Sequence, residues 1–272
     1  MKKRSQKTRF LVRWSSVALL VILITGLLKW NFTRTNSTTG ADRTIQSLKR
    51  GAERGDAKAQ YRLSLAYDKG AGVEADMAQS ITWLRKAAGQ GDAQAEFKLG
   101  NAYRFGRGVA QDDVEATMWF RKAADQGHAV AQCSLGVAYM VGQGVVSNEV
   151  EAVKWFRRSV EQGDILAQYN LGNAYTLGRG VAQDDEAAVK WFRKAADQGH
   201  ALAQYNLGIC YARGRGVDQD IRAAYGWFLL SAAGGDGDAP VFLESLEKLL
   251  SPSEKEAARS WMKAWKPAAV TE

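Results

Sequence analysis

The residues of this chain best suited to catalysis or metal binding are two histidines and a few pairs of neighbouring acids. His128 and His200 occupy matching places in a repeated pattern, where the other copies have aspartate, and no third ligand recurs beside them. This exchange of His for Asp predicts helix-cap or turn residues and no metal site. Acid pairs such as Asp112-Asp113 stand where helices are predicted to begin, so we expect no acid/base dyad from them.

The two cysteines, Cys133 and Cys210, are predicted to be packing residues. They lie two copies of the repeat apart, which is about 20 Å at ~10 Å per helix layer, whereas a disulfide joins Cα atoms within about 7 Å. The recurring Gly-x-Gly-Val turns lack the preceding strand of a nucleotide-binding loop. Because no nucleophile–base pair is present either, we predict a protein that is not an enzyme and binds no cofactor.

The charge of the chain is concentrated at its N-terminus. The 272 residues carry a net charge of +8, and residues 1–40 hold eight of the 37 bases and no acid. Residues 41–272 therefore contain 29 bases and 29 acids, which gives no support for nucleic-acid binding by the main body. Only 3 prolines and 2 cysteines are present, which argues against a disordered chain and a disulfide scaffold.

Residues 1–30 are predicted to form a basic N-terminus and a transmembrane signal anchor. Trp14 to Leu28 is uncharged and mostly apolar, and Arg13 and Lys29 bound it. As a helix this run rises about 22 Å, which is shorter than the hydrocarbon core of a bilayer. Flanking apolar residues can extend the span if the side chains of Arg13 and Lys29 snorkel to the interface. The alternative is a cleaved signal peptide. The run does not end in a small-x-small cleavage site, which argues against this alternative.

The bases around this span predict its orientation. Six of them precede it, and the positive-inside rule then places the N-terminus in the cytoplasm and the repeats on the far side. We expect a single-pass protein of the inner membrane with periplasmic repeats or, if the segment is cleaved, a protein secreted to the periplasm. Residues 31–41 are rich in Thr, Ser and Asn, and we expect a flexible linker there.

Residues 57–236 repeat one pattern five times at a spacing of 36 residues. Tyr67 and Trp83 of the first copy recur in every later copy, and each such Tyr is followed by Gly-x-Gly-Val. The copies are residues 57–92, 93–128, 129–164, 165–200 and 201–236. This register predicts five structurally equivalent units.

Each copy is predicted to form two helices joined by the Gly-x-Gly turn. Ala, Leu, Ala or Cys, Tyr and Gly at unit positions 3, 7, 10, 11 and 14 share one face of the first helix. The turn ends this helix, because a C-cap favours positive φ. Asp or Asn at position 20 is predicted to cap the second helix, and Glu115 and Glu151 to complete capping boxes.

The second helix is predicted to bury the recurring Trp at position 27, together with the Phe or Leu that follows it. Small residues in both helices let the two approach closely, while Trp and Phe fill the space between layers. The Arg-Lys pair at positions 29 and 30, as in Arg121-Lys122, is predicted to form a solvated face.

These residues resemble the Sel-one-like repeat family, a branch of the tetratricopeptide-type helical repeats. The shared pattern is A-x-A-Q-Y-x-L-G-x-x-Y-x-x-G-x-G-V and then D-x-x-x-A-x-x-W-F-R-K-A-A-x-Q-G, of which residues 165–200 are close to an ideal copy. The resemblance implies an all-α fold, an α/α superhelical solenoid of five 36-residue helix-turn-helix repeats, whose members mostly bind other proteins as scaffolds. Some members carry a cysteine pair in every repeat, and a few of those are linked to β-lactamase activity. This chain lacks the pairs.

The terminal segments are predicted to cap the repeats. Residues 48–56 match the end of a second helix, so we expect residues 42–56 to form an N-terminal capping half repeat and residues 237–272 to form C-terminal capping helices. In the last helix Ser251 is a predicted N-cap, with Pro252 at the first helical position and Glu254 completing a capping box.

A stripe at unit positions 2, 6, 9 and 13 of the first helices is the predicted binding groove. It lies about 90° from the buried face, on helices that line the concave wall of such solenoids. Its candidate residues are Lys58, Arg62, Lys98, Asn101, Val137, Leu166, Asn170, Asn173, Asn206 and Ile209. Asparagine offers a donor and an acceptor to a peptide backbone, and adjacent apolar residues need a partner. The alternative is that the stripe packs on the neighbouring first helix or is merely solvated.

The sequence therefore predicts a membrane-tethered scaffold or adaptor that binds a segment of a partner protein in this groove. The stripe begins basic and turns apolar and amide-rich, so we expect a segment that is acidic at one end and apolar at the other. Two alternatives stay open: an immunity-type protein that neutralises a toxic enzyme in the periplasm, and a cell-wall or β-lactam hydrolase. Neither nucleic acid nor metal is predicted as a partner.

Overall fold

The computed structural model describes residues 43–268, so the predicted anchor (1–30) and linker (31–41) lie outside the described part. The described residues form helices joined by turns and contain no strand, which confirms the all-α prediction. None of the helices described is both long enough and apolar enough to cross a membrane. The described residues form two compact units, and the boundary between them lies between Lys86 and Ala87.

In the first unit, the described residues begin with a helix at 43–53, which precedes α2 (Ala57–Lys69) and the greater part of α3 (Met77–Gly89). The carboxylate of Asp56 caps α2 by accepting a hydrogen bond from the backbone N–H of Ala59 at 3.0 Å. Ile45 and Ala52 of helix 43–53 share a buried cluster with Leu63 of α2. Helix 43–53 therefore packs on α2, as a second helix does on the next first helix in the other repeats.

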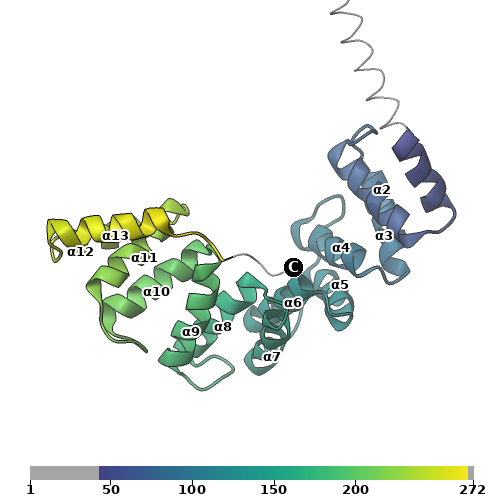
Figure 1. The fold of residues 1–272 in the computed structure, drawn as a ribbon. Coiled ribbons are helices and arrows are strands. Elements are labelled where there is room, and N and C mark those ends of the chain that lie inside the picture. The colour runs from purple at the N-terminus through teal and green to yellow at the C-terminus, as the bar shows by residue number, and fades with distance from the viewer. Residues whose placement is uncertain (1–42, 269–272) are drawn as a thin grey trace, which may run out of the picture. The chain divides into compact units, whose positions relative to one another are not determined.

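The second unit continues with one helix pair for each repeat and two helices after the last pair (Figure 1). Its helices are α4 (Ala93–Phe105), α5 (Asp113–Asp125), α6 (Ala129–Val141), α7 (Glu149–Val160), α8 (Ile165–Leu177), α9 (Asp185–Asp197), α10 (Ala201–Arg213), α11 (Ile221–Ala233), α12 (Ala239–Glu247) and α13 (Pro252–Ala264). From α4 to α11 each helix packs on the next one in the chain, so a layered solenoid results. We call α2, α4, α6, α8 and α10 the first helices, and α3, α5, α7, α9 and α11 the second helices.

Each first helix ends at a glycine in the left-handed region, as predicted. In the third repeat this residue is Gly142, with φ 73°. The second glycine of the turn, Gly144, has a different role: a Cβ there would overlap the backbone carbonyl of Asp113 at the start of α5. Gly-x-Gly thus both ends a helix and lets the turn touch the second helix of the preceding repeat.

The predicted N-caps of the second helices are confirmed, but the predicted capping boxes are not. Asp112 Oδ1 accepts from the backbone N–H of Glu115 at 3.0 Å, and Asn148 Oδ1 does the same for Glu151. A capping box also needs the N-cap backbone N–H as a donor to the Glu side chain. In Asp112 that N–H donates to the carbonyl of Tyr103 at 3.0 Å, and Asn148 is bonded in the same way, so the turn already uses the donor.

In the second to fifth repeats the core is a phenylalanine of the second helix packed on a glycine of the first; the first repeat has Leu84 and Ser64 at these positions. A Cβ at Gly136 would lie 2.6 Å from the ring of Phe156, which is 1% exposed. The recurring tryptophans are less uniform than predicted. Trp155 and Trp227 are buried, whereas Trp119 and its other two counterparts are only half-buried. A base three residues later covers the indole, as where Lys122 Nζ lies 4.0 Å from the ring centre of Trp119.

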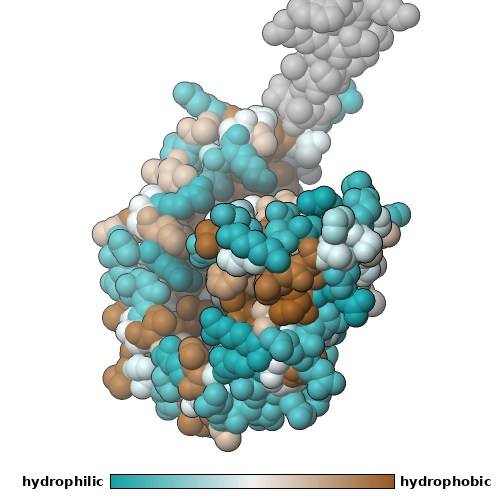
Figure 2. Space-filling model, turned by 90° about the vertical axis from the view of Figure 1, so that its left-hand side faces the viewer, coloured by the Kyte–Doolittle hydropathy of each residue, from teal (hydrophilic) through white to brown (hydrophobic). Residues whose placement is uncertain are grey.

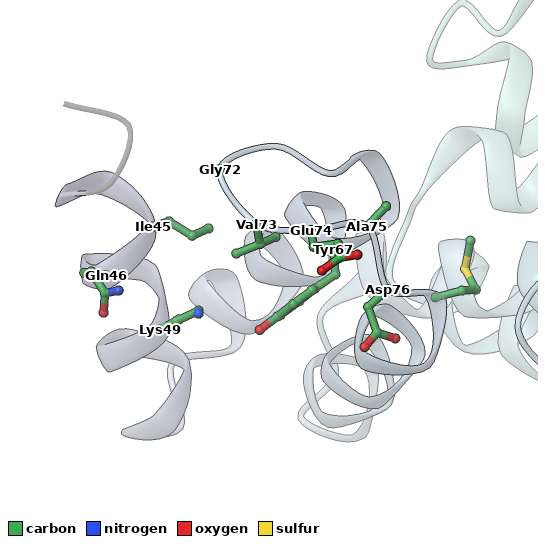
Figure 3. Close-up of a pocket in the computed structure, with 10 residues that line it drawn as sticks. Ile45, Gln46, Lys49, Tyr67, Gly72, Val73, Glu74, Ala75 and Asp76 are labelled. Atoms are coloured by element: carbon green, nitrogen blue, oxygen red, sulfur yellow. The ribbon is translucent and has the colours of Figure 1, made fainter. Parts of the chain in front are cut away.

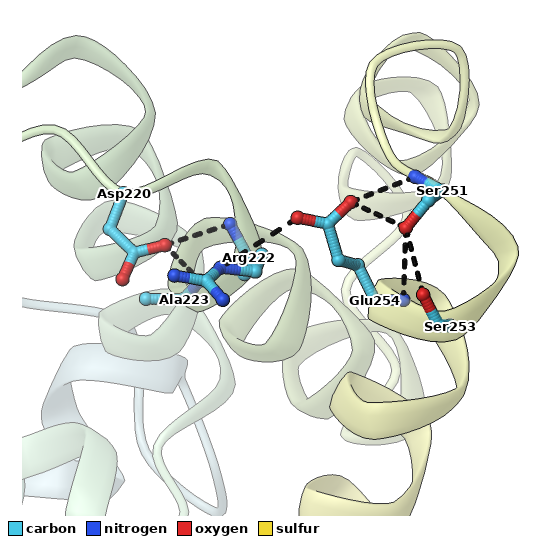
Figure 4. Close-up of polar contacts among 6 residues, drawn as sticks. All are labelled: Asp220, Arg222, Ala223, Ser251, Ser253 and Glu254. Carbon is cyan, nitrogen blue, oxygen red and sulfur yellow. Dashed lines mark hydrogen bonds and ion pairs between the residues drawn. The ribbon is translucent and has the colours of Figure 1, made fainter.

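The C-terminal helices close the last repeat by packing on α11. Ser251 and Glu254 form the predicted capping box, and Glu254 also approaches Arg222 of α11 with an N···O distance of 4.0 Å (Figure 4). Trp261 of α13 meets Trp227 edge to face, with ring centres 5.2 Å apart. Asp236 occupies the unit position of His128 and His200, which is the predicted helix-cap position. The next helix instead begins at Ala239, and the Asp236 carboxylate holds the turn before it by accepting from the N–H of Asp238.

Candidate functional site

Both histidines are helix caps, as predicted. His128 Nδ1 accepts from the backbone N–H of Ala131 at 3.2 Å, and His200 caps α10 in the same way at 3.1 Å. The imidazole of His128 also lies on the ring of Phe97, with centres 4.7 Å apart. Burial lowers the pKa of both imidazoles, which favours the neutral form that the caps need. Among residues 43–268 no group of ligands suits a metal ion.

Both cysteines are buried, free packing residues, which confirms their predicted role. Burial raises the pKa of the Cys210 thiol to about 11 and shifts the pKa of Cys133 further in the same direction. Because the thiolate is the reactive form, neither side chain is primed for nucleophilic attack near neutral pH. Cys133 Sγ instead accepts a weak hydrogen bond from Asn170 Nδ2 at 3.8 Å.

The arginine at unit position 29 lies at the surface, as predicted, and it also contacts the next repeat: Arg157 is exposed, and Arg121 and Arg193 are half-buried. Arg157 Nη2 donates to the hydroxyl of Tyr175 in the next repeat at 3.1 Å. Arg121 and Arg193 donate in the same way to Tyr139 and Tyr211, the corresponding tyrosines of the repeats that follow them. The contact ties α5, α7 and α9 to the first helices that follow them. Its signal in the sequence is the constant spacing of 18 residues between a recurring Arg and a recurring Tyr.

The predicted groove residues fall into both units. Lys58 and Arg62 lie on α2 in the first unit, and both are exposed. The other eight lie on first helices of the second unit. Leu166 is exposed, and the remaining seven are half-buried: Lys98, Asn101, Val137, Asn170, Asn173, Asn206 and Ile209. In the second unit the stripe is therefore accessible at its edges and partly packed along its middle.

The edges of the stripe carry two rows of exposed apolar side chains. At unit position 2 the row consists of Val130, Leu166 and Leu202, which are 40–50% exposed. At unit position 13 it consists of Phe105, Val141 and Leu177, which are 61–65% exposed. All six lie at positions of the predicted stripe, but only Leu166 was among its candidate residues. The signal that identifies the others is the recurrence of apolar residues at positions that face away from the core.

The middle of the stripe is partly engaged between neighbouring repeats. Asn206 Nδ2 donates to Asn173 Oδ1 at 3.2 Å, so the amides of α10 and α8 are joined directly. Asn170 bonds Cys133 of α6, as described above. These two hydrogen bonds agree with the alternative that the stripe packs on the neighbouring first helix.

A cavity of about 250 Å³ opens between α6 and α8 within this stripe. Val137, Met140 and Val141 of α6 line one wall, and Asn170, Asn173 and Leu177 of α8 line the other. Phe156 of α7 also borders the space. The site thus combines apolar surface with amide groups, the composition expected of a peptide-binding surface.

Two further cavities lie near the ends of the described chain. One of about 760 Å³ in the first unit is bordered by Ile45, Lys49 and Tyr67 and by the turn at residues 72–77 (Figure 3). One of about 390 Å³ lies between α11 and α13, beside Trp227 and Trp261. On the side of the molecule seen in Figure 2, apolar surface is exposed between polar side chains.

Comparison with known proteins relates the repeats to one family. The family model described as Sel1 repeat matches residues 57–92, 93–128, 129–164, 165–200 and 201–236. A Sel1 repeat protein from Oxalobacter formigenes has a similar crystal structure, with 33% identity over 87% of this chain and 95% of that one and a TM-score of 0.73. The protective antigen c5321 of uropathogenic Escherichia coli, described as displaying an SLR fold, has 30% identity over 83% of this chain and 56% of that one, with a TM-score of 0.57.

Weaker similarity extends to the immunity protein Pa5087 from Pseudomonas aeruginosa, with 23% identity over 76% of this chain and 81% of that one and a TM-score of 0.47. No curated protein matches the chain.

Proposed function

Because this chain belongs to the Sel1 repeat family, whose members act in protein–protein interaction, we propose that its first helices bind a segment of a partner protein. The chain acts as a scaffold or adaptor in this proposal, and the part of the predicted groove in the second unit is its binding surface. Helices α6, α8 and α10 supply the floor of the groove.

The observation that carries the proposal is the pair of apolar rows at unit positions 2 and 13. Leu166 and Leu202 are about half exposed, and Val141 and Leu177 are exposed still further. Isolated apolar side chains on a surface need no explanation, but exposed apolar residues that recur at the same positions of successive helices favour a partner. The amides of Asn170, Asn173 and Asn206 run between the rows and suit a peptide backbone.

The proposal also includes the membrane anchor predicted from residues 1–30. The N-terminus then lies in the cytoplasm and the repeats face the periplasm, and signal cleavage with release to the periplasm is the alternative. Protease added to spheroplasts should digest the repeats, and the intact chain should retain its N-terminus. Protection of the repeats would contradict the orientation, and a mature N-terminus near residues 27–42 would contradict the anchor.

The binding face is tested by site-specific photo-cross-linking in cells. A benzoylphenylalanine replaces Leu166 on α8 or, as the matched control, Val150 on α7, which is 55% exposed. We expect one discrete cross-linked protein from position 166 and none from position 150. Cross-links from position 150 alone would assign binding to the second helices and refute the groove.

The two alternative functions stay predictions. Neutralisation of a toxic enzyme would use the same kind of binding surface, and identification of the cross-linked protein tests it directly. Turnover of nitrocefin by the purified chain tests β-lactam hydrolysis.

A further inference from the structure

We propose that the cavity between α6 and α8 is a socket for one large apolar side chain of the bound segment, and that this segment carries acidic residues on both sides of that side chain. The inference rests on the proposed function, since it concerns the same face of the first helices. It adds the chemistry of the partner and the point at which the segment is anchored.

The socket exists because of one difference between neighbouring repeats. Between α8 and α10 two side-chain amides are hydrogen-bonded: Asn206 Nδ2, at unit position 6 of α10, donates to Asn173 Oδ1, at unit position 9 of α8, at 3.2 Å. Between α6 and α8 the same two positions are Val137 and Asn170. The side chain of Val137 cannot form a hydrogen bond with the amide of Asn170, and Asn170 Nδ2 donates to Cys133 Sγ instead. No amide–amide hydrogen bond therefore joins unit positions 9 and 6 here, and a space of about 250 Å³ remains beside them.

The chemistry of the socket favours an apolar occupant. Val137, Met140, Val141 and Leu177 give it apolar walls. The one charged side chain at its border, Arg179, is already neutralised, because its Nε donates to Glu149 Oε1 at 2.6 Å and its Nη2 to the carbonyl of Met140 at 2.9 Å. An acidic side chain would find no unpaired positive charge in this space, whereas a large apolar side chain would bury apolar surface that is otherwise exposed to solvent.

The amides beside the socket suit the backbone of an extended segment. Asn173 uses its Oδ1 for Asn206, which leaves its Nδ2 as a donor without a partner among the described residues. A carbonyl of a bound segment can accept from that Nδ2 while a neighbouring side chain enters the socket. This arrangement fixes both the position and the direction of the segment.

The charges on either side of the socket define the flanking residues of the partner. Helices α6 and α8 contain no charged residue at all. Helix α4 on one side carries Lys98 and Arg104, and its one acid, Glu96, is buried; α10 on the other side carries Arg213. Acidic residues before and after the apolar anchor complement this pattern. The expectation of a single acidic end had counted Lys58 and Arg62 of the first unit.

A random dodecapeptide library displayed on phage, selected against the full chain, tests the proposal. Enriched peptides should share a large apolar residue with Asp or Glu on both sides. Their synthetic copies should bind Val137→Trp, which fills the socket, about 10- to 100-fold more weakly, the range for losing one large buried apolar side chain. Leu177→Lys, at an exposed wall position that cannot disturb the core, should weaken binding similarly. The matched control Val150→Lys on α7 should change it less than about threefold.

Three outcomes would overturn the proposal. The selection could yield no acidic-flanked apolar motif, or the peptides could bind Val137→Trp and Leu177→Lys as tightly as the unchanged chain. Alternatively, the full chain could form a dimer in sedimentation that Leu177→Lys abolishes, which would make a second copy the occupant. Unchanged peptide binding with cross-links still confined to position 166 would leave the proposed function standing and remove only the socket.

Discussion

Trp155 offers the sharpest test of how the repeats are held together, because an adjacent repeat supplies a natural control. Trp155 and Trp191 occupy the same unit position in the third and fourth repeats, and each has repeats on both sides. Trp155 is 3% exposed, whereas Trp191 is half-buried. Replacing each with alanine therefore removes the same side chain from two different degrees of burial.

The expected loss at Trp155 follows from its surroundings. It packs against Ala124, Ala131 and Leu135, and truncation of such a buried aromatic to Ala costs about 3–5 kcal/mol in transfer and cavity terms. Its indole Nε1 has no hydrogen-bond partner within the described residues, so no hydrogen bond is lost. The guanidinium of Arg158, 4.4 Å from the ring centre, contributes about 0.5–1 kcal/mol of this total through the cation–π contact.

Urea unfolding followed by circular dichroism measures both variants. We expect Trp155→Ala to lose about 3–5 kcal/mol and to split the transition, since a solenoid unfolds through nearest-neighbour interfaces. Trp191→Ala should lose about 1–2 kcal/mol, because less apolar area leaves water on folding. Equal losses, or an unchanged transition for Trp155→Ala, would show that burial of this indole does not stabilise the stack.

Further predictions concern single positions. Burial raises the pKa of Glu96, so the folded state loses stability as pH rises through that raised pKa. Glu96→Gln restores the residue found in the other repeats. In thermal melts this variant should be more stable than the unchanged chain at pH 8 and about equally stable at pH 4. Burial lowers the pKa of His128 and of its counterpart His200, so stability should fall as pH drops from about 6.5 toward their lowered pKa; replacing both with Asp should flatten that decline between pH 7 and 5. Gly136→Ala places a Cβ 2.6 Å from the Phe156 ring and should cost about 1–3 kcal/mol in urea unfolding. The thiol-specific reagent DTNB should label Cys133 and Cys210 only after denaturation, because both are buried.

The elements of the fold could be predicted because their signals are local. A capping Asp or His, a run of apolar residues on one helical face and a glycine at the C-cap lie within a few residues of one another, and backbone sterics fix what they do. Repetition at 36 residues then showed that the same local structure recurs. Asp112 illustrates the limit of this reasoning: its capping by side chain was predictable, but the use of its N–H by Tyr103 was not.

The candidate site was predictable only in outline. The stripe identified which positions of the first helices avoid the core, and Leu166 is indeed exposed on α8. The sequence did not reveal that Asn206 turns to Asn173, or that Val137 leaves a space beside Asn170. Those outcomes depend on pairs of side chains in different repeats. The spacing of residues along one helix does not determine how far such side chains lie from each other.

The sequence by itself thus determined the number of repeats, the two helices of each and the residues that begin and end them, since these follow from backbone geometry and hydrophobic periodicity. Tertiary structure alone decided what the recurring residues do across the repeat interfaces. It made Arg157, which stays exposed, also a donor to Tyr175 of the next repeat, and it made Gly144 necessary beside Asp113. The physical reason is that such contacts form between surfaces that come together only when complete helices stack.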